Sequence, residues 1–326
     1  MFPRISVVIP VYNELENLEP LLARVHPILD RDPHKHFEVI FIDDGSRDGS
    51  SELLDDFHAR DLRYKTIHFS RNFGHQPALQ AGLDAAKGDA VVMMDADLQD
   101  PPELISDFIA KWNEGYEVVY AIRKRREEPW WKQFAYKTFY KLLNFMADID
   151  TPLDAGDFCL MDRRVVEELV GLQERNRFIR GLRSWVGFRQ TGIEFDRAAR
   201  HAGAPKYTLR KLLTLAFDGY LGFTSMPLRA AAWLGLLSAG AGFSLICWII
   251  INRMTATYIP QGWASSTAIT LFIGGVQLLV LGVMGEYLRR VYDEVRKRPL
   301  YVVRSRIGFA EEEDSRHFAP TRLARS

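Results

Sequence analysis

The chain has 326 residues, a length typical of about two domains. Lys plus Arg and Asp plus Glu each total 42, and this zero formal charge argues against a protein that binds nucleic acid over its whole surface. Hydrophobic residues make up 47% of the chain, which excludes a mainly disordered protein. The two cysteines, Cys159 and Cys247, argue against a disulfide framework or a four-ligand zinc site.

Short apolar runs alternate with helical patterns in the first part of the chain. The apolar runs are 5–11, 37–42, 64–69, 90–94 and 117–122. The helical patterns are 15–29, 51–60 and 76–86. This alternation predicts an α/β domain with a mostly parallel, doubly wound sheet and helices on both faces. Ligands bind such sheets beyond the carboxyl ends of the strands.

Polar clusters follow three of these runs, at 12–14, 43–46 and 95–100, and we expect them to converge on one edge of the sheet. Asp95 and Asp97, spaced i and i+2 after a strand, can both direct oxygens at one Mg²⁺ or Mn²⁺ ion. Such an ion also binds substrate phosphates, which favours a diphosphate ligand. No GxxxxGK[ST] or GxGxxG motif occurs, so neither an NTPase nor a dehydrogenase is supported.

Two residues with reactive side chains are interpreted as structural. His75 has no companion at metal-ligand spacing, so we expect a loop residue rather than a metal ligand. Cys159 is expected to be a small buried residue rather than a nucleophile.

Two uncharged stretches, 230–251 and 254–285, follow the α/β region. A helix needs about 20 apolar residues to cross roughly 30 Å of hydrocarbon. The first stretch satisfies this outright and the second contains a candidate at 264–284, so we expect two transmembrane helices; a buried hairpin of a soluble protein is the alternative. The apolar run after Met1 breaks at residues 12–14, so no cleavable signal peptide is expected.

Basic residues set the expected orientation. One of them, Arg229, precedes the first span and a cluster at 289–298 follows the second, whereas the connector carries Arg253 alone. By the positive-inside rule, both termini and the large domain face the cytoplasm. The expected organisation is a cytoplasmic domain over 1–226, a two-helix anchor over 227–288, and a basic helix with a disordered tail from about Ser305 over 289–326.

Two stretches mix basic, aromatic and aliphatic residues, at about 129–146 and 206–223. Both are interpreted as amphipathic helices that lie in the membrane interface and present the site to a lipid. Ordinary core packing or a subunit contact is the alternative interpretation.

An ordered set of motifs resembles family 2 glycosyltransferases of the GT-A fold, a Rossmann-like fold. The motifs are SVVIPVYNE (6–14), IDDGSRDGS (42–50), DADLQDPPE (95–103), RNFGHQPALQAG (71–82), DAGDFCLMDR (154–163), ERNRFIRGLRSWVGF (174–188), GAPKY (203–207) and MGEYLRRVYDEVRKRPLYVV (284–303). Together they resemble the bacterial polyprenyl-phosphate glycosyltransferases, especially bactoprenol glucosyltransferases, and more distantly dolichyl-phosphate mannose synthases. The resemblance extends to about Arg304 and includes both expected spans.

The resemblance implies roles for individual residues. A pocket for the nucleotide sugar would be formed by Pro10, Tyr12, Glu14, Asp44, Asp95, Ala96, Arg200 and Lys206. The metal would be held by Asp95, Asp97 and Gln99. Catalysis would depend on Asp97, on Arg123 at the phosphates and on Asp157 as base. For Arg123, a basic surface run that holds anionic lipid is the alternative. Because a phosphate acceptor is largely a dianion at pH 7, a strong base is not obligatory, and Asp157 could instead orient a hydroxyl or a loop.

The expected activity is an inverting, metal-dependent transfer of a hexose, glucose from UDP-glucose above all, to undecaprenyl phosphate. It would take place at the cytoplasmic face of the inner membrane, with Mg²⁺ or Mn²⁺ as cofactor, for cell-envelope or O-antigen glycosylation. Expected partners are the nucleotide sugar, the polyprenyl phosphate, membrane lipids and further copies of this chain, without nucleic acid. Alternatives are another donor (a UDP-N-acetylhexosamine, UDP-galactose or GDP-mannose) or a catalytically silent membrane scaffold.

Overall fold

A computed structural model describes most of the chain. The described residues are 5–30, 37–123, 155–172, 174–175, 177–195, 226–255 and 262–310. They fall into two compact units. The first contains the described residues up to 195 together with 299–310, and the second contains those between 226 and 298.

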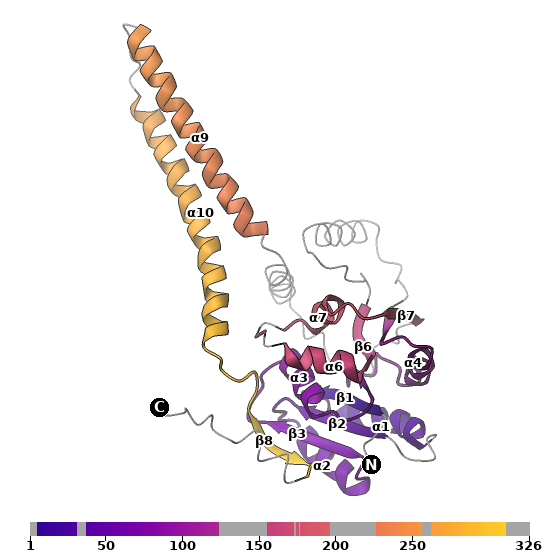
Figure 1. Cartoon of the computed structure of the whole chain (residues 1–326). Helices are drawn as coiled ribbons and strands as arrows, with labels where there is room; N and C mark the ends of the chain where they lie inside the picture. Colours follow the sequence, from indigo (N-terminus) through magenta and orange to yellow (C-terminus); the bar gives the residue numbers. More distant parts are fainter. Residues whose placement is uncertain are drawn as a thin grey trace, which may run out of the picture. The chain divides into compact units, whose positions relative to one another are not determined.

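An eight-stranded sheet forms the centre of the first unit (Figure 1). Its strands are β1 (Ile5–Val11), β2 (Phe37–Asp43), β3 (Tyr64–Phe69), β4 (Ala90–Met93), β5 (Val118–Arg123), β6 (Ala155–Asp162), β7 (Gln190–Phe195) and β8 (Val303–Ile307). Their order is β7-β5-β6-β4-β1-β2-β3-β8. Strands β1 to β4 pair in parallel, as do β5 and β7, whereas β6 is antiparallel to both of its neighbours and β8 is antiparallel to β3.

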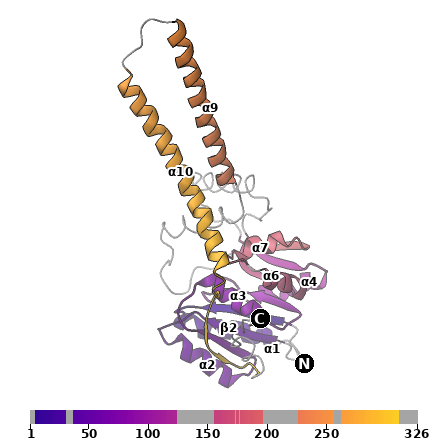
Figure 2. The same ribbon diagram turned by 60° about the vertical axis from the view of Figure 1, so that its left-hand side comes forward.

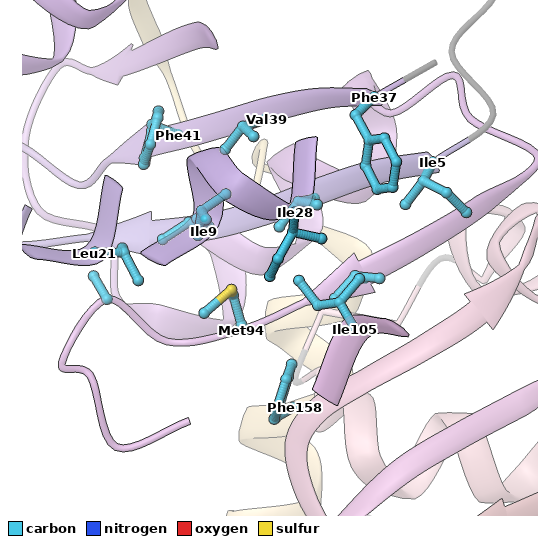
Figure 3. Close-up of a cluster of buried hydrophobic side chains, with 14 of the residues drawn as sticks. Ile5, Ile9, Leu21, Ile28, Phe37, Val39, Phe41, Met94, Ile105 and Phe158 are labelled. Carbon is cyan, nitrogen blue, oxygen red and sulfur yellow. The ribbon is translucent and has the colours of Figure 1, made fainter. Parts of the chain in front are cut away.

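Helices cover both faces of this sheet. They are α1 (Leu15–Asp30), α2 (Ser50–Arg60), α3 (His75–Ala85), α4 (Leu104–Asn113), α6 (Arg163–Gly171) and α7 (Ile179–Trp185). Apolar side chains of α1, α2 and α4 join alternate residues of the strands in one buried core, part of which is drawn in Figure 3. Because successive strand residues point to opposite faces, the other residues of the same strands serve the second layer.

The second layer contains α3, α6 and α7. Helix α3 approaches β1 so closely that a Cβ at Gly82 would lie 2.1 Å from Val8 Cγ1. Helix α6 packs against α3 and β6, and α7 packs against β6 and α6. The sheet is therefore enclosed between two layers of helices, which explains why its central strands are apolar on both faces.

The expected mixed α/β class is confirmed, and the expected strands and helices up to Arg123 are present. Two antiparallel strands, β6 and β8, were not expected. Residues Ser305–Ile307, placed by the sequence at the start of a disordered tail, belong to β8 and pair with β3. The Tyr301 ring stacks on Phe69 at a centroid distance of 4.9 Å, and its hydroxyl donates to Asp84 at 2.7 Å. These contacts hold the segment that follows the apolar region on the edge of the sheet.

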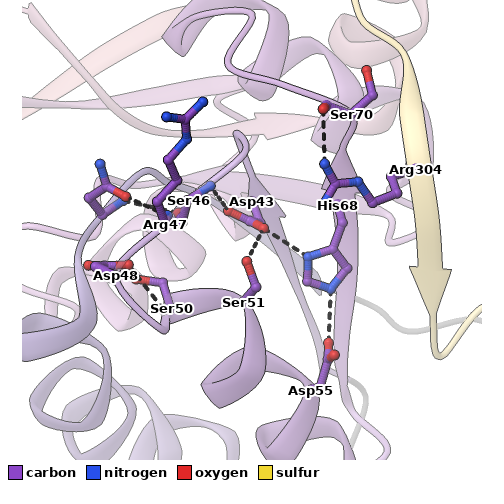
Figure 4. A network of polar contacts seen from close by, with 11 residues as sticks. Asp43, Ser46, Arg47, Asp48, Ser50, Ser51, Asp55, His68, Ser70 and Arg304 are labelled. Atoms are coloured by element: carbon purple, nitrogen blue, oxygen red, sulfur yellow. Dashed lines mark hydrogen bonds and ion pairs between the residues drawn. The ribbon is translucent and has the colours of Figure 1, made fainter.

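A buried network closes the carboxyl end of β2 (Figure 4). The Asp43 carboxylate accepts hydrogen bonds from Ser46 N and Ser51 Oγ and contacts His68 Nδ1 at 2.9 Å. The other ring nitrogen of His68 lies 2.9 Å from Asp55. Burial raises the pKa of Asp43, but these partners outweigh it and lower the pKa to about 2. Burial lowers the pKa of His68, and the two carboxylates raise it above its ordinary value.

Two long helices, α9 (Met226–Thr255) and α10 (Trp263–Val295), make up most of the second unit. They lie side by side in Figures 1 and 2. Within the described residues, one segment, Phe272–Val295, is long and apolar enough to cross a membrane, with a mean hydropathy of 1.3. The expected span at 230–251 lies within α9 and stays a prediction.

Replacing Gly82 with alanine should destabilise the first unit by about 1–3 kcal/mol, the usual cost of overpacking a filled core, because the new methyl group overlaps Val8. Thermal unfolding of the purified protein measures the effect. Gly171→Ala is the matched control, since no atom lies within 4 Å of a Cβ built there. The double variant Val8→Ala/Gly82→Ala should recover part of the loss; equal stability of Gly82→Ala and wild type would contradict this packing.

Stability should also depend on pH through His68. Its folded pKa is raised, so its contribution is fully present below its unfolded pKa of about 6.5 and is lost as the pH rises through the folded value. The free energy of unfolding should therefore fall less between pH 6 and pH 9 in His68→Gln than in wild type. Denaturant titrations at the two pH values measure this, and parallel curves for the two proteins would refute it.

Candidate active site

The carboxyl ends of β1, β2 and β4 meet because these three strands are neighbours in the sheet. Asp44 N donates to Val11 O at 2.9 Å, and Asn13 N donates to Ser46 Oγ at 3.0 Å, so the segments after β1 and β2 are joined. Met94 N donates to Val8 O at 3.1 Å and keeps the end of β4 against β1. The polar residues after the three strands thus lie along one edge of the sheet.

The segment after β1 turns sharply into α1. Pro10 is buried in the strand, whereas Tyr12 is exposed. Asn13 adopts a positive φ of 53°, a conformation that asparagine tolerates better than most residues. The Glu14 carboxylate accepts a hydrogen bond from Asn17 Nδ2 at 2.6 Å. This turn leaves the Tyr12 ring accessible at the edge of the sheet.

Asp44 is buried and organises the loop that leads into α3. Its two carboxylate oxygens accept hydrogen bonds from Phe73 N at 2.6 Å and Gly74 N at 2.9 Å. Burial raises the pKa of Asp44 above its ordinary value, and the two backbone N–H groups counteract this only in part. Gly45 has φ 73°, and a Cβ there would lie 2.7 Å from the backbone of Arg71, so glycine permits this close approach. By holding Phe73 and Gly74, Asp44 also fixes the position of His75, the residue that follows Gly74.

The segment after β4 carries the two aspartates of the DxD pair. Asp95 and Asp97 are half-buried, and Ala96 between them is buried. Asp97 Oδ1 accepts a hydrogen bond from Gln99 N at 3.1 Å, and Leu98 has φ 60°. Both carboxylates of the DxD pair thus lie just after the carboxyl end of β4, which neighbours β1.

Asp157 reaches the same edge from the opposite direction. Because β6 is antiparallel to β4 and pairs Cys159 with Met93, the beginning of β6 lies beside the end of β4. Asp157 precedes Cys159 by two residues and therefore shares its face of the sheet, the face covered by α7. Its side chain is 11% exposed. Cys159 is fully buried, as expected.

His75 lies between the two acidic groups, a position that the sequence did not predict. It is the first residue of α3, not a loop residue. Its Nε2 lies 3.7 Å from Asp95 Oδ1 and 3.6 Å from Asp157 Oδ2. Burial lowers the pKa of His75, but the hydrogen bond with Asp157 and the charge of Asp95 raise it above its ordinary value.

Arg180, on α7, pairs with Asp157 through two parallel contacts. Nε donates to Oδ1 at 2.8 Å and Nη2 to Oδ2 at 2.9 Å. Burial raises the pKa of Asp157, but Arg180 and His75 together hold it well below the ordinary range. A carboxylate in this state is a weak base, so the geometry favours a positioning role for Asp157 over proton abstraction.

For three expected site residues the structure describes no side chain. Arg123 ends β5, but its side chain is not described. Arg200 and Lys206 lie outside the described residues, as do the stretches 129–146 and 206–223. Their expected roles stay predictions.

Asp95 and Asp97 are chemically suited to Mg²⁺ or Mn²⁺, because both ions prefer carboxylate oxygens. Among the described residues, no group of three or more His, Cys, Asp or Glu could hold a metal ion. The two aspartates would therefore have to share the ion with phosphate oxygens and water, an arrangement that is usual for Mg²⁺.

Sequence reasoning missed His75 and Arg180 as members of the site. Metal-ligand spacing does not reveal His75, because the two carboxylates that it contacts follow β4 and belong to β6, 20 and 82 residues further along the chain. Arg180 is one of four arginines between 174 and 188, and the short helix α7 selects which of them faces Asp157. The signal available was the presence of both residues in the quoted motifs, RNFGHQ and ERNRFIRG.

Comparison with known proteins places this chain in a family. The model of the family Glycosyl transferase family 2 matches residues 6–170, which include Asp44, Asp95 and Asp157. An uncharacterized glycosyltransferase of Bacillus subtilis, YkcC, is 47% identical over 304 residues, covering 93% of this chain and 94% of its own. A prophage-derived bactoprenol glucosyl transferase of Shigella flexneri is 40% identical over 302 residues, covering 92% and 97%.

Among solved structures, S. aureus TarS 1-349 in complex with UDP-GlcNAc is 17% identical and covers 88% of this chain and 81% of its own, with a TM-score of 0.45. A TM-score this low does not establish a shared fold, so the assignment depends on the sequence matches. Since those matches extend over nine-tenths of the chain and through the acidic edge of its sheet, the chain belongs to glycosyl transferase family 2 and is a glycosyltransferase.

Proposed function

We propose that this protein transfers a hexose, glucose from UDP-glucose, to undecaprenyl phosphate or a similar polyprenyl phosphate. The observation that carries the proposal is the 40% identity to a bactoprenol glucosyl transferase over 92% of the chain, which includes the long helices as well as the sheet.

The proposed reaction needs stabilisation of negative charge more than it needs a base. A phosphate oxygen of the acceptor donates an electron pair to the anomeric carbon, and the bond from that carbon to the nucleoside diphosphate breaks with its electrons on the diphosphate. Because the second pKa of a phosphate monoester is near 6, the attacking group is mostly a dianion at pH 7 and has no proton to lose. The resulting inversion makes a β-linked product from an α-linked donor.

The proposed donor site is the edge formed by the ends of β1, β2 and β4. The exposed ring of Tyr12 and the Glu14 carboxylate would contact the nucleoside, beside Pro10 and Asp44. Asp44 would act through the loop that it holds, because both of its oxygens accept backbone hydrogen bonds. Arg123, Arg200 and Lys206 are the proposed further contacts to the donor.

Asp95, Asp97 and Gln99 are the proposed metal ligands. Ala96, between the two aspartates, is a proposed contact to the nucleotide sugar. A bound Mg²⁺ or Mn²⁺ would supply electrostatic stabilisation of the departing diphosphate. Asp157 is proposed to position Arg180 and His75, since its bidentate pair with Arg180 and its lowered pKa make it a weak base.

Membrane attachment through α9 and α10 is part of the proposal. Large apolar side chains on both helices are exposed, among them Trp233, Phe243, Phe272 and Leu278. Lipid tails would cover this surface, which water solvates poorly. We propose that both helices span the membrane and that the glycosyltransferase domain lies at the cytoplasmic face. We also propose that the protein assembles into homo-oligomers.

The donor sugar and the scaffold alternative are tested by one assay. Purified protein in detergent or nanodiscs is supplied with undecaprenyl phosphate, Mn²⁺ or Mg²⁺, and radiolabelled UDP-glucose, UDP-galactose, UDP-N-acetylhexosamine or GDP-mannose. We expect label in the lipid phase from UDP-glucose. Labelling from another sugar would correct the donor, and no labelling from any donor by folded protein would favour a silent scaffold.

Asp97→Asn should reduce transfer by about 100-fold or more, the scale of losing one electrostatic contribution to the transition state, and should weaken Mn²⁺ binding. The latter is measured separately by electron paramagnetic resonance of free Mn²⁺ in the presence of UDP. Asp107→Asn is the matched control, because Asp107 is an exposed aspartate on α4. Unaltered Mn²⁺ binding in Asp97→Asn would refute the metal assignment.

A further inference from the structure

Three basic side chains lie around Asp157 and the residue before it, Gly156. Arg180 forms a bidentate pair with this carboxylate, and His75 lies 3.6 Å from it. Arg183, one turn further along α7, is 1% exposed and donates to the carbonyl of Gly156 at 3.4 Å. Asp157 therefore contacts one guanidinium and one imidazole, and a second guanidinium contacts the carbonyl of the residue before it.

Arg183 has different partners from Arg180. Its guanidinium lies 5.2 Å from the centre of the Tyr120 ring, and in the described part of the chain no carboxylate is paired with it. Buried charges are normally paired, so a guanidinium in this position raises the local positive potential. A second anion beside α7 would be stabilised by that potential.

Water reaches two members of this cluster, Arg180 and His75. The Arg180 side chain is 36% exposed, compared with 11% for Asp157, so the carboxylate lies on the buried side of the guanidinium. Phosphate oxygens match the same fork geometry as carboxylate oxygens.

The position of Arg180 also suits an acceptor. His75 connects its partner Asp157 to Asp95, with 3.7 Å from the imidazole to the Asp95 carboxylate. An anion held by Arg180 would therefore stand one side chain away from the pair proposed to hold the donor phosphates.

From this arrangement we infer that Arg180 binds the phosphate of the acceptor, and that Asp157 keeps the guanidinium oriented for it. The inference deepens the proposed function and rests on it for the identity of the lipid. Arg180 contacts the oxygens that do not attack, which leaves the third terminal oxygen of the phosphate to form the bond to the sugar.

The test is binding of radiolabelled undecaprenyl phosphate to the full-length protein in nanodiscs. In Arg180→Gln the dissociation constant for the lipid phosphate should rise about 10- to 100-fold, the range expected for a lost hydrogen bond to a charged group. In Arg180→Lys it should rise less, because the charge remains while the fork is lost. The affinity for UDP with Mn²⁺, measured by calorimetry, should stay unchanged in both variants and also reports that each is folded.

Arg164→Gln is the matched control. Arg164 pairs with Asp162 and Glu117 at the other end of β6 and is 66% exposed, so its loss removes the same charge without touching the site. It should bind lipid phosphate as wild type does. If Arg180→Gln fails to fold because Asp157 is left unpaired, Asp157→Asn/Arg180→Gln removes both charges and should show the same loss of lipid binding.

The outcomes separate the two hypotheses. Equal loss of UDP affinity in Arg180→Gln would assign Arg180 to the donor diphosphate and overturn the inference, as would unaltered lipid binding. Wild-type protein that binds the lipid phosphate through Arg180 but transfers no sugar to it would overturn the proposed function and leave the inference standing. Absence of lipid-phosphate binding in wild type would overturn both.

Discussion

A buried carboxylate needs positive or N–H partners, and much of this domain is arranged to provide them for Asp157. Antiparallel β6 brings Asp157 to the edge where the parallel strands end, α7 brings Arg180, and α3 begins at His75. Removal of any one of these elements would leave a charge in a poorly solvated position. The geometry of the site is therefore set by electrostatic compensation between three elements far apart in the sequence.

The same constraint acts on the neighbouring strand. Asp43 and Asp44 follow one another, but they face different partners: Asp43 contacts His68 and Ser51 within the fold, whereas Asp44 holds the backbone before α3. One carboxylate consequently stabilises the packing of α2 on the sheet, and the other fixes an edge of the site. Their opposite pKa shifts follow from this division, since Asp43 has more hydrogen-bond donors to offset its burial.

The sequence predicts those parts of the fold that depend on local periodicity. Alternation of apolar runs and helical patterns located β1 to β5 and α1 to α3, and the rule of strand ends located Asp44, Asp95 and Asp97 on one edge. It did not locate β8, because pairing with β3 depends on an edge that only the folded sheet offers. His75 and Arg180 were not predicted for a similar reason, because their partner Asp157 lies 82 residues from His75 and 23 residues from Arg180 along the chain.

The return of the chain to the sheet at β8 covers an edge of the sheet that would otherwise be open. Because β7 precedes α9 and β8 follows α10, the two-helix unit is inserted within the glycosyltransferase domain and is joined to it by both of its ends. Truncation after α10 would remove β8 and leave the hydrogen-bonding edge of β3 unpaired, and such an edge can template pairing with a second chain and so promote aggregation.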